Sequence, residues 1–239
     1  MALIGLNRDE LDLSQLPKDS FYDPKKDDKD DLSGVQIRAT ITFKITNPDG
    51  TVVREWTEPA HSLNSNFALI IQAMWGATSV NVGDTSGNTL TVNGASGGTM
   101  AVTAPSGNTD YGIVVGSGAS AGSTPSPSAP YLKAPIPQGT SSGQLEYGAV
   151  SVSTASVSGQ TTSFTITRSF TNVSGATINV TEIGIIAYLT GWAMVVSSAG
   201  TEASASSDYV LIAYDIPSSE IPIQNGQTLT ITYTFSVTT

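Results

Sequence analysis

Two segments alternate apolar and polar residues with a period of two, and this pattern constrains the fold more than any other feature. One segment covers residues 35–46 and the other covers residues 229–237. Successive side chains of a strand point to opposite faces, so the alternation predicts two half-buried strands. The second segment runs nearly to Thr239, and we expect it to pair inside a sheet. The apolar positions are Val35, Ile37, Ala39, Ile41, Phe43 and Ile45, then Leu229, Ile231, Tyr233, Phe235 and Val237.

Further strands are predicted between these two segments. The turn 47–50 (Asn-Pro-Asp-Gly) makes residues 35–58 a β-hairpin, because Pro presets φ and Gly accepts a positive φ. Only 13% of the residues are charged and 23 are glycine, which suits short strands joined by turns. We therefore predict a mainly β fold, an antiparallel β-sandwich of the jelly-roll or Ig-like kind, as one domain at 35–239. The other strands are expected at 144–157, 163–172, 177–189 and 209–215.

One amphipathic helix is predicted at residues 65–75. Ser65 is the expected N-cap, and Gly76 stands where a glycine ends many helices. We expect the apolar stripe to pack on the sheet, and we expect Trp75 and Trp192 to lie in the core as well. The stripe falls at i, i+3, i+4 and i+7, at Phe67, Ile70, Ile71 and Met74.

Residues 77–130 are expected to be rich in loops, with short strands at 89–93, 99–103 and 110–115. Within this region, residues 117–130 are a low-complexity run of Gly, Ser and Pro that will not hold a strand ladder. We expect a long surface loop here rather than a domain boundary, because neither flank obviously closes a core alone.

Residues 1–34 differ from the rest and predict an extended, charged N-terminal arm. The stretch 23–31 has no apolar residue and cannot pack a core of its own. A solvated tail is one interpretation. Apolar residues interrupt the charged ones, however, and they favour an arm that lies on a neighbouring subunit. These candidate anchors are Leu3, Ile4, Leu6, Leu11, Leu13, Leu16, Phe21 and Tyr22.

The charge balance argues against several kinds of partner. The formal net charge is −10, and beyond Arg54 the only basic residues are Lys133 and Arg168. A nucleic acid or an anionic membrane needs clustered Lys and Arg, so neither is expected as a partner. The chain has no Cys, which excludes disulfides and thiolate metal sites. The apolar residues at 2–6 are too few for a signal peptide, so we expect synthesis in a cytoplasm.

Few residues suggest catalysis, and we predict no enzymatic activity, no cofactor and no metal. His61 is the only histidine, and it has no nucleophile motif nearby. The acidic run 27–31 does not match a calcium-binding loop. The triplet 116–118 (Gly-Ser-Gly) opens a loop rather than a helix, so it is not expected to hold a phosphate.

Arg168 and Glu182 both fall on the apolar phase of predicted strands. A buried charge is costly unless it is paired, so we predict a structural ion pair between these two residues. The alternative makes Glu182 the acid of a glycosidase, but no second carboxylate is evident close to it.

Five segments of the second half of the chain occur in a recognisable order. They are Tyr111–Gly118, Gly143–Gly148, Arg168–Asn172, Thr181–Gly184 and Gly226–Thr230. This pattern resembles the β-rich virion-associated proteins of tailed bacteriophages and prophages. The resemblance covers residues 110–239, and the hairpin and helix at 35–76 match more weakly. It implies that the strands carrying Arg168 and Glu182 are neighbours.

The same resemblance implies a non-enzymatic virion structural protein, used as a capsid decoration, neck, tail or fibre component. Its partners would be other virion proteins and copies of itself in a homo-oligomer. It would be made in the host cytoplasm and end in the virion. The alternative is a receptor- or glycan-binding fibre module, which predicts exposed aromatic residues on the loops of 77–130.

Overall fold

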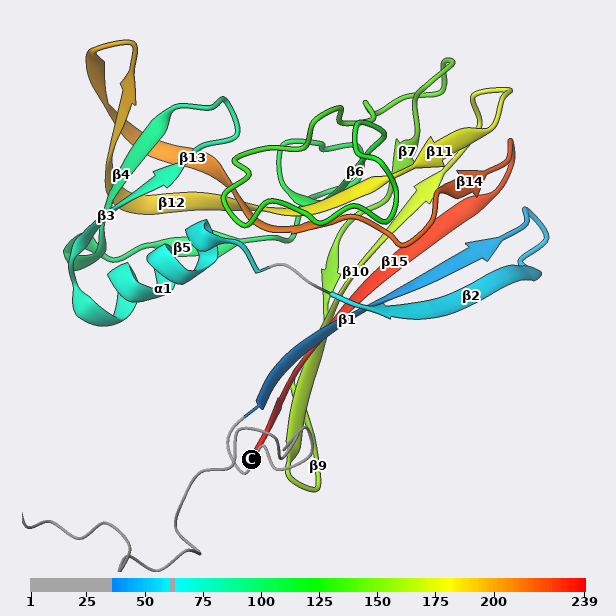
Figure 1. The fold of residues 1–239 in the computed structure, drawn as a ribbon, viewed down its shortest axis with the longest axis horizontal. Helices are drawn as coiled ribbons and strands as arrows, with labels where there is room; N and C mark the ends of the chain where they lie inside the picture. The colour runs from blue at the N-terminus through cyan, green and yellow to red at the C-terminus, as the bar shows by residue number, and fades with distance from the viewer. Residues whose placement is uncertain (1–35, 61–62) are drawn as a thin grey trace, which may run out of the picture. The chain divides into compact units, whose positions relative to one another are not determined.

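The computed structural model describes residues 36–60 and 63–239, and the elements of this part are drawn in Figure 1. The chain divides into two units, Met1–Gly34 and Val35–Thr239. The described part is mainly β, and the pairs between its named strands are antiparallel. Two sheets pack on one another as a sandwich, which confirms the predicted fold class.

The first sheet has seven strands, with three long strands at its centre. The C-terminal strand β15 (Thr228–Thr238) lies between β1 (Gln36–Thr46) and β10 (Thr161–Thr171). The terminal strand therefore pairs inside the sheet, as predicted. Strand β2 (Val52–Pro59) continues the sheet beside β1. On the other side, three short strands pair with β10: β7 (Glu146–Tyr147), β8 (Ser151–Val152) and β9 (Ser156–Ser158).

The second sheet has six strands and is built around two long ones. These are β12 (Glu182–Ser198) and β13 (Thr201–Asp215), which form a hairpin. Residues 117–130 form no strand, as predicted. The remaining strands are β3 (Ser79–Gly83), β4 (Thr89–Asn93), β5 (Thr99–Ala101) and β6 (Gly112–Gly116), with a short 3-10 turn at Gly94–Ser96.

The strand predicted at 177–189 is in fact two strands. β11 (Ile178–Val180) pairs with β14 (Ile221–Ile223) in a separate two-stranded sheet. The chain then passes Thr181 and enters β12 in the six-stranded sheet. One apolar run thus serves two sheets, which alternation alone does not reveal.

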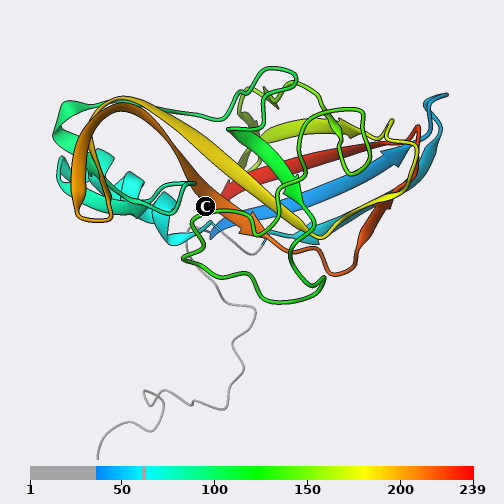
Figure 2. The ribbon, with the colours of Figure 1, turned by 90° about the horizontal axis from the view of Figure 1, so that it is seen from above.

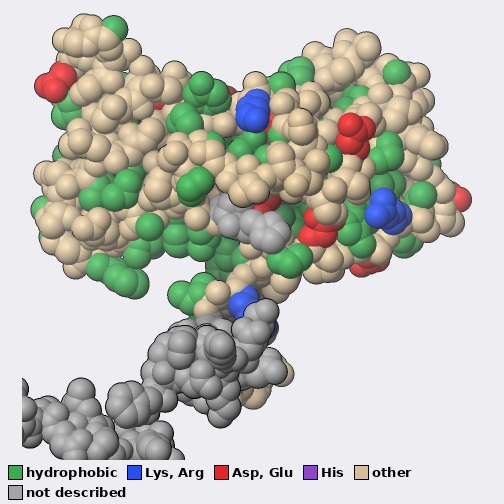
Figure 3. Space-filling model, viewed as in Figure 1, with side chains coloured by type: hydrophobic (Ala, Val, Ile, Leu, Met, Phe, Trp, Pro, Cys, Tyr) green, Lys and Arg blue, Asp and Glu red, His purple; other side chains and the backbone are tan. Residues whose placement is uncertain are grey.

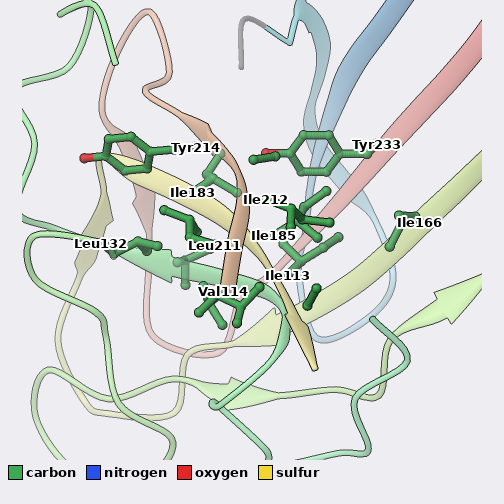
Figure 4. Close-up of a cluster of buried hydrophobic side chains, with 14 of the residues drawn as sticks. Ile113, Val114, Leu132, Ile166, Ile183, Ile185, Leu211, Ile212, Tyr214 and Tyr233 are labelled. Carbon is green, nitrogen blue, oxygen red and sulfur yellow. The ribbon is translucent and has the colours of Figure 1, made fainter. Parts of the chain in front are cut away.

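The core lies between the inner faces of the two large sheets. Figure 4 shows Ile113 and Ile185 of the six-stranded sheet on the side of the cluster where Ile166 and Tyr233 of the seven-stranded sheet lie. Figures 1 and 2 show β12 and β13 crossing one end of the seven-stranded sheet. Strands β1, β15 and β10 run on past this crossing, toward the end of the chain marked C in Figure 1.

The outer face of the seven-stranded sheet consists largely of threonine and serine. Hydroxyl groups bond across the strands, from Thr167 to Thr232 at 3.1 Å and between Thr171 and Thr228 at 2.9 Å. The period of two in the sequence therefore separates an apolar inner face from a polar outer face, which also carries the Lys44–Glu55 ion pair.

Helix α1 (Ser65–Gly76) forms where it was predicted, but with different caps. Asn64 is the N-cap, and its Oδ1 accepts a hydrogen bond from the Phe67 N–H at 3.3 Å. The helix ends at Ala77, which has a left-handed backbone conformation. The sequence pattern predicts Gly76 in this role.

The predicted core stripe of the helix is partly wrong. Ile70 is buried, but Met74 is 46% exposed and Trp75 is 85% exposed. The reason is that polar side chains orient the helix. Asn64 and Asn66 each donate to the Leu211 carbonyl oxygen, at 2.7 and 3.1 Å, and both are buried. The inward face is therefore the one that holds Asn66. Trp192, in contrast, is buried as predicted, at 4% exposed.

Candidate functional site

Arg168 is the largest fully buried side chain and faces inward from β10, 1% exposed. Its Nε donates to the Gly148 carbonyl oxygen at 2.8 Å, and Nη1 donates to the Ile113 carbonyl oxygen at 2.8 Å. Its Cζ lies 4.8 Å from the centre of the Tyr147 ring. Burial lowers the pKa of Arg168 to about 10. The remaining acceptors are the carbonyl oxygens of Tyr111, Pro105 and Asn108.

Glu182 begins β12 and is completely buried. Its Oε1 accepts the Gly118 N–H at 2.9 Å and the Ala134 N–H at 2.8 Å. Its Oε2 accepts the Lys133 N–H at 2.9 Å and the Tyr214 hydroxyl at 2.8 Å. These donors match the four lone-pair sites of a carboxylate. Burial, with the bond to Glu182, raises the pKa of Tyr214 well above its usual range.

The predicted ion pair between Arg168 and Glu182 is wrong. Strands β10 and β12 belong to different sheets, so they are not neighbours. Each charge is compensated by backbone groups instead, carbonyl oxygens for the cation and N–H groups for the anion. Within residues 36–60 and 63–239, the ion pair found is the surface pair Lys44–Glu55, at 3.7 Å. The two buried charges therefore hold loops against the sandwich.

The triplet 116–118 has a role that the sequence did not indicate. A Cβ atom on Gly116 would lie 2.5 Å from Glu182 Oε1, and one on Gly118 would lie 2.7 Å from the Ala134 nitrogen. Such distances are too short for any side chain, so only glycine lets the loop approach. The N–H groups of Gly118, Lys133 and Ala134 do bind an anion, but that anion is the protein's own Glu182 carboxylate.

A second feature is an apolar surface where the long strands leave the sandwich. Ile37 is 71% exposed, Val157 is 74% exposed, and Val237 and Phe164 are 38% and 37% exposed. Phe164 stacks on half-buried Phe235, with ring centres 5.2 Å apart. We call this surface, formed by the residues just named, the apolar sheet end.

The strand register shows that the apolar sheet end continues the core. Ile37, Val237 and Val157 occupy one row across β1, β15 and β9, and Phe235 and Phe164 lie in the next row along. In the row after that, the side chains are almost completely buried: Ile41 at 2%, Tyr233 at 1% and Ile166 at 6% exposed. The same face is thus covered by the second sheet from Ile41 onward, and no residue of 36–60 or 63–239 covers it before that row.

The sequence contains one signal that points to this uncovered surface. β1, β10 and β15 each have 11 residues, which corresponds to about 35 Å of strand at roughly 3.3 Å per residue. The strands of the facing sheet cross these long strands at one end of the seven-stranded sheet instead of running along them (Figure 1). The apolar face beyond this crossing is therefore left open.

Exposed aromatic residues also flank the loop-rich region. Trp75 is 85% exposed and Tyr131 is 49% exposed. Tyr111, Tyr188 and Tyr209 instead pack on one another, with ring centres 5.2–6.1 Å apart. Figure 3 shows one face of the molecule, on which the charged side chains are scattered rather than gathered.

A cavity of about 410 Å³ lies between the end of β2 and the Gly/Ser/Pro loop. The Glu58 carboxylate lies at its wall and accepts hydrogen bonds from Ser218 Oγ at 2.6 Å, the Ser218 N–H at 3.0 Å and Trp56 Nε1 at 3.0 Å. Burial alone would raise the pKa of Glu58, but these hydrogen bonds outweigh burial and lower it. The other lining residues are Pro59, Leu63, Gly122, Ser123, Thr124, Pro125, Pro127 and Ile216.

Replacing Ser218 by Ala is expected to raise the pKa of Glu58 toward its ordinary value, because one donor to the carboxylate is removed. A carboxylate with a lowered pKa stabilises the fold above its unfolded pKa, and this contribution is lost as the pH falls through the folded pKa. The stability of the variant should therefore fall less than that of the natural protein as the pH is lowered. An NMR titration of the Glu58 carboxyl carbon measures the shift. Ser123→Ala is the control, and an equal pKa in both variants would contradict the assignment.

Several predicted residues lie outside the described part of the chain. His61 is one of them. In residues 36–60 and 63–239, no group of three or more His, Asp or Glu side chains could hold a metal ion. No helix of that same part is long and apolar enough to cross a membrane. The arm anchors also lie outside it: Leu3, Ile4, Leu6, Leu11, Leu13, Leu16, Phe21 and Tyr22.

Comparison of the chain with protein-family models, with curated proteins and with solved structures finds no match.

Proposed function

We propose that this protein is a non-enzymatic virion structural protein of a tailed phage, which assembles on a capsid or tail through residues 1–34 and its β-sandwich. The observation that carries the proposal is the apolar sheet end, where Ile37 and Val157 are more than two-thirds exposed. A contiguous exposed apolar surface is typical of an interaction site. The order of the segments in residues 110–239, which resembles virion-associated proteins, supplies the virion context.

The buried charges support a structural role for the sandwich. All the lone pairs of Glu182 are used by donors within the protein. The N–H groups of Arg168 likewise donate to backbone carbonyl oxygens, including those of Gly148 and Ile113. Neither group is therefore available to act on a substrate. Both residues instead make the loops rigid, which suits a subunit that must present a fixed surface.

The solution mass of the full chain and of residues 35–239, measured by light scattering, tests this proposal. Residues 35–239 are a suitable truncation because they form a unit of their own. We expect a defined oligomer for the full chain and a smaller, folded species for the truncated chain. A monomeric full chain that also fails to bind phage particles would overturn the proposal.

A receptor- or glycan-binding module is the second candidate function. The observation in its favour is that Trp75 and Tyr131, which flank the loop-rich region in the sequence, are both exposed. Aromatic side chains with one exposed face provide large contact areas for ligands. The same number of subunits for both chains in the light-scattering experiment, together with glycan binding by residues 35–239, would favour this candidate.

A further inference from the structure

We propose that the apolar sheet end binds the same surface of a second copy of this chain, so that two seven-stranded sheets pack face to face around a two-fold axis. This inference rests on the proposed function, because it names the partner of the assembly surface. The evidence is the continuity of the surface with the core, its lack of charge and the geometry of the covered part.

Continuity with the core makes another sheet the natural covering layer. The rows of Ile41, Tyr233 and Ile166 are covered by the six-stranded sheet, and the two rows before them repeat the same pattern of side chains. Sheets in a sandwich pack about 10 Å apart, with the side chains of both inner faces interdigitating. A second sheet end can extend this packing, since it presents the same kind of side chains.

The absence of charge favours a second copy over an unrelated partner. The apolar sheet end contains only aliphatic and aromatic side chains, and the uncharged Thr162 lies between Val237 and Val157 in the row of Ile37. Arg38, the nearest basic residue on β1, belongs to the opposite face because side chains alternate along a strand. A two-fold interface places the same surface patch on both subunits, so a patch that carried charges of one sign would repel its own copy. An uncharged surface avoids that cost, which matters for a chain of net charge −10.

The covered part of the sheet fixes the direction of the second copy. From Ile41 onward the face is occupied by the chain's own second sheet, so the partner cannot extend in that direction. The two-fold axis must therefore run across the strands, with the two sandwiches pointing away from one another. In this arrangement β9 lies opposite β9 of the partner copy, and the two Val157 side chains approach each other.

A single cysteine at position 157 tests the arrangement, because the natural chain has no Cys. The full-length Val157→Cys protein is treated with a short bismaleimide and separated by denaturing electrophoresis. We expect a covalent dimer. Val53→Cys is the matched control, since Val53 is also an exposed strand valine, 51% exposed, at the other end of the sheet. It should remain largely uncrosslinked.

Adding Ile37→Thr and Val237→Thr to the Val157→Cys chain should abolish the cross-link. Threonine retains the strand preference and both side chains are exposed, so the fold is preserved and circular dichroism should be unchanged. Equal cross-linking of the two cysteine variants, or a cross-link that survives both threonines, would overturn this inference. If the full chain is an oligomer in light scattering and yet fails these tests, only this inference falls. A full chain that is monomeric and does not bind particles overturns both proposals.

Discussion

Replacing Glu182 by Gln is expected to lower the free energy of unfolding by about 2–4 kcal/mol. Its amide nitrogen donates and cannot accept, so it cannot replace Oε2, which accepts the Lys133 N–H at 2.9 Å and the Tyr214 hydroxyl at 2.8 Å. The tyrosine hydroxyl can rotate to accept from the new amide, whereas the Lys133 N–H has no such freedom. A buried donor without an acceptor costs about 1–3 kcal/mol, and the loss of charge weakens the other bonds.

The measurement is thermal or denaturant unfolding, and a loss of about 3 kcal/mol corresponds to roughly 6–12 °C in Tm for a domain of this size. Glu55→Gln is the control. Glu55 pairs with Lys44 at 3.7 Å on the surface, and such pairs contribute less than about 1 kcal/mol. Hydrogen exchange should also quicken at the amides of Gly118, Lys133 and Ala134. A variant with the wild-type Tm and protected amides would show that the carboxylate does not hold these loops.

The fold could be predicted well because alternation is a local property of the sequence. The residues of β1 and β15 show it without interruption, and both strands lie where the period of two places them. The helix was harder. Its location follows from apolar spacing, but its rotation is decided by Asn64 and Asn66, whose partners Leu211 and Gly83 are distant in sequence. Trp75 was therefore assigned to the core although it is exposed.

The candidate site was less predictable for a related reason. The apolar phase correctly indicated that Arg168 and Glu182 are buried, at 1% and 0% exposed. Their partners are backbone groups of irregular loops, which no pattern of side chains reveals. A charge rule then suggested pairing the two residues with each other. The apolar sheet end was missed because alternation identifies the inner face of a strand but not how far the opposite sheet covers it.

Replacing Arg168 by Lys is expected to destabilise the protein more than Glu182→Gln does, by about 3–5 kcal/mol. The planar guanidinium reaches Gly148 through Nε and Ile113 through Nη1, both at 2.8 Å, and its remaining N–H groups reach the preceding loop. An ammonium group is a single point on a flexible chain and cannot span these acceptors. Several buried carbonyl oxygens would then lack a donor, and the contact over Tyr147, at 4.8 Å, would be weakened. Urea unfolding measures the loss, and Arg38→Lys on the exposed edge should be neutral within about 0.5 kcal/mol.

A double-mutant cycle of Arg168→Lys and Glu182→Gln separates the observed arrangement from a direct ion pair. Arg168 holds residues 105–113 and Gly148, whereas Glu182 holds Gly118, Lys133 and Ala134, so the two residues share no partner. Effects of residues without shared partners add within about 0.5 kcal/mol. A larger coupling would mean that the two residues do not act independently. Additive losses, each confined by hydrogen exchange to its own loops, would show that the sandwich holds the loops on either side of β6 with two independent buried charges.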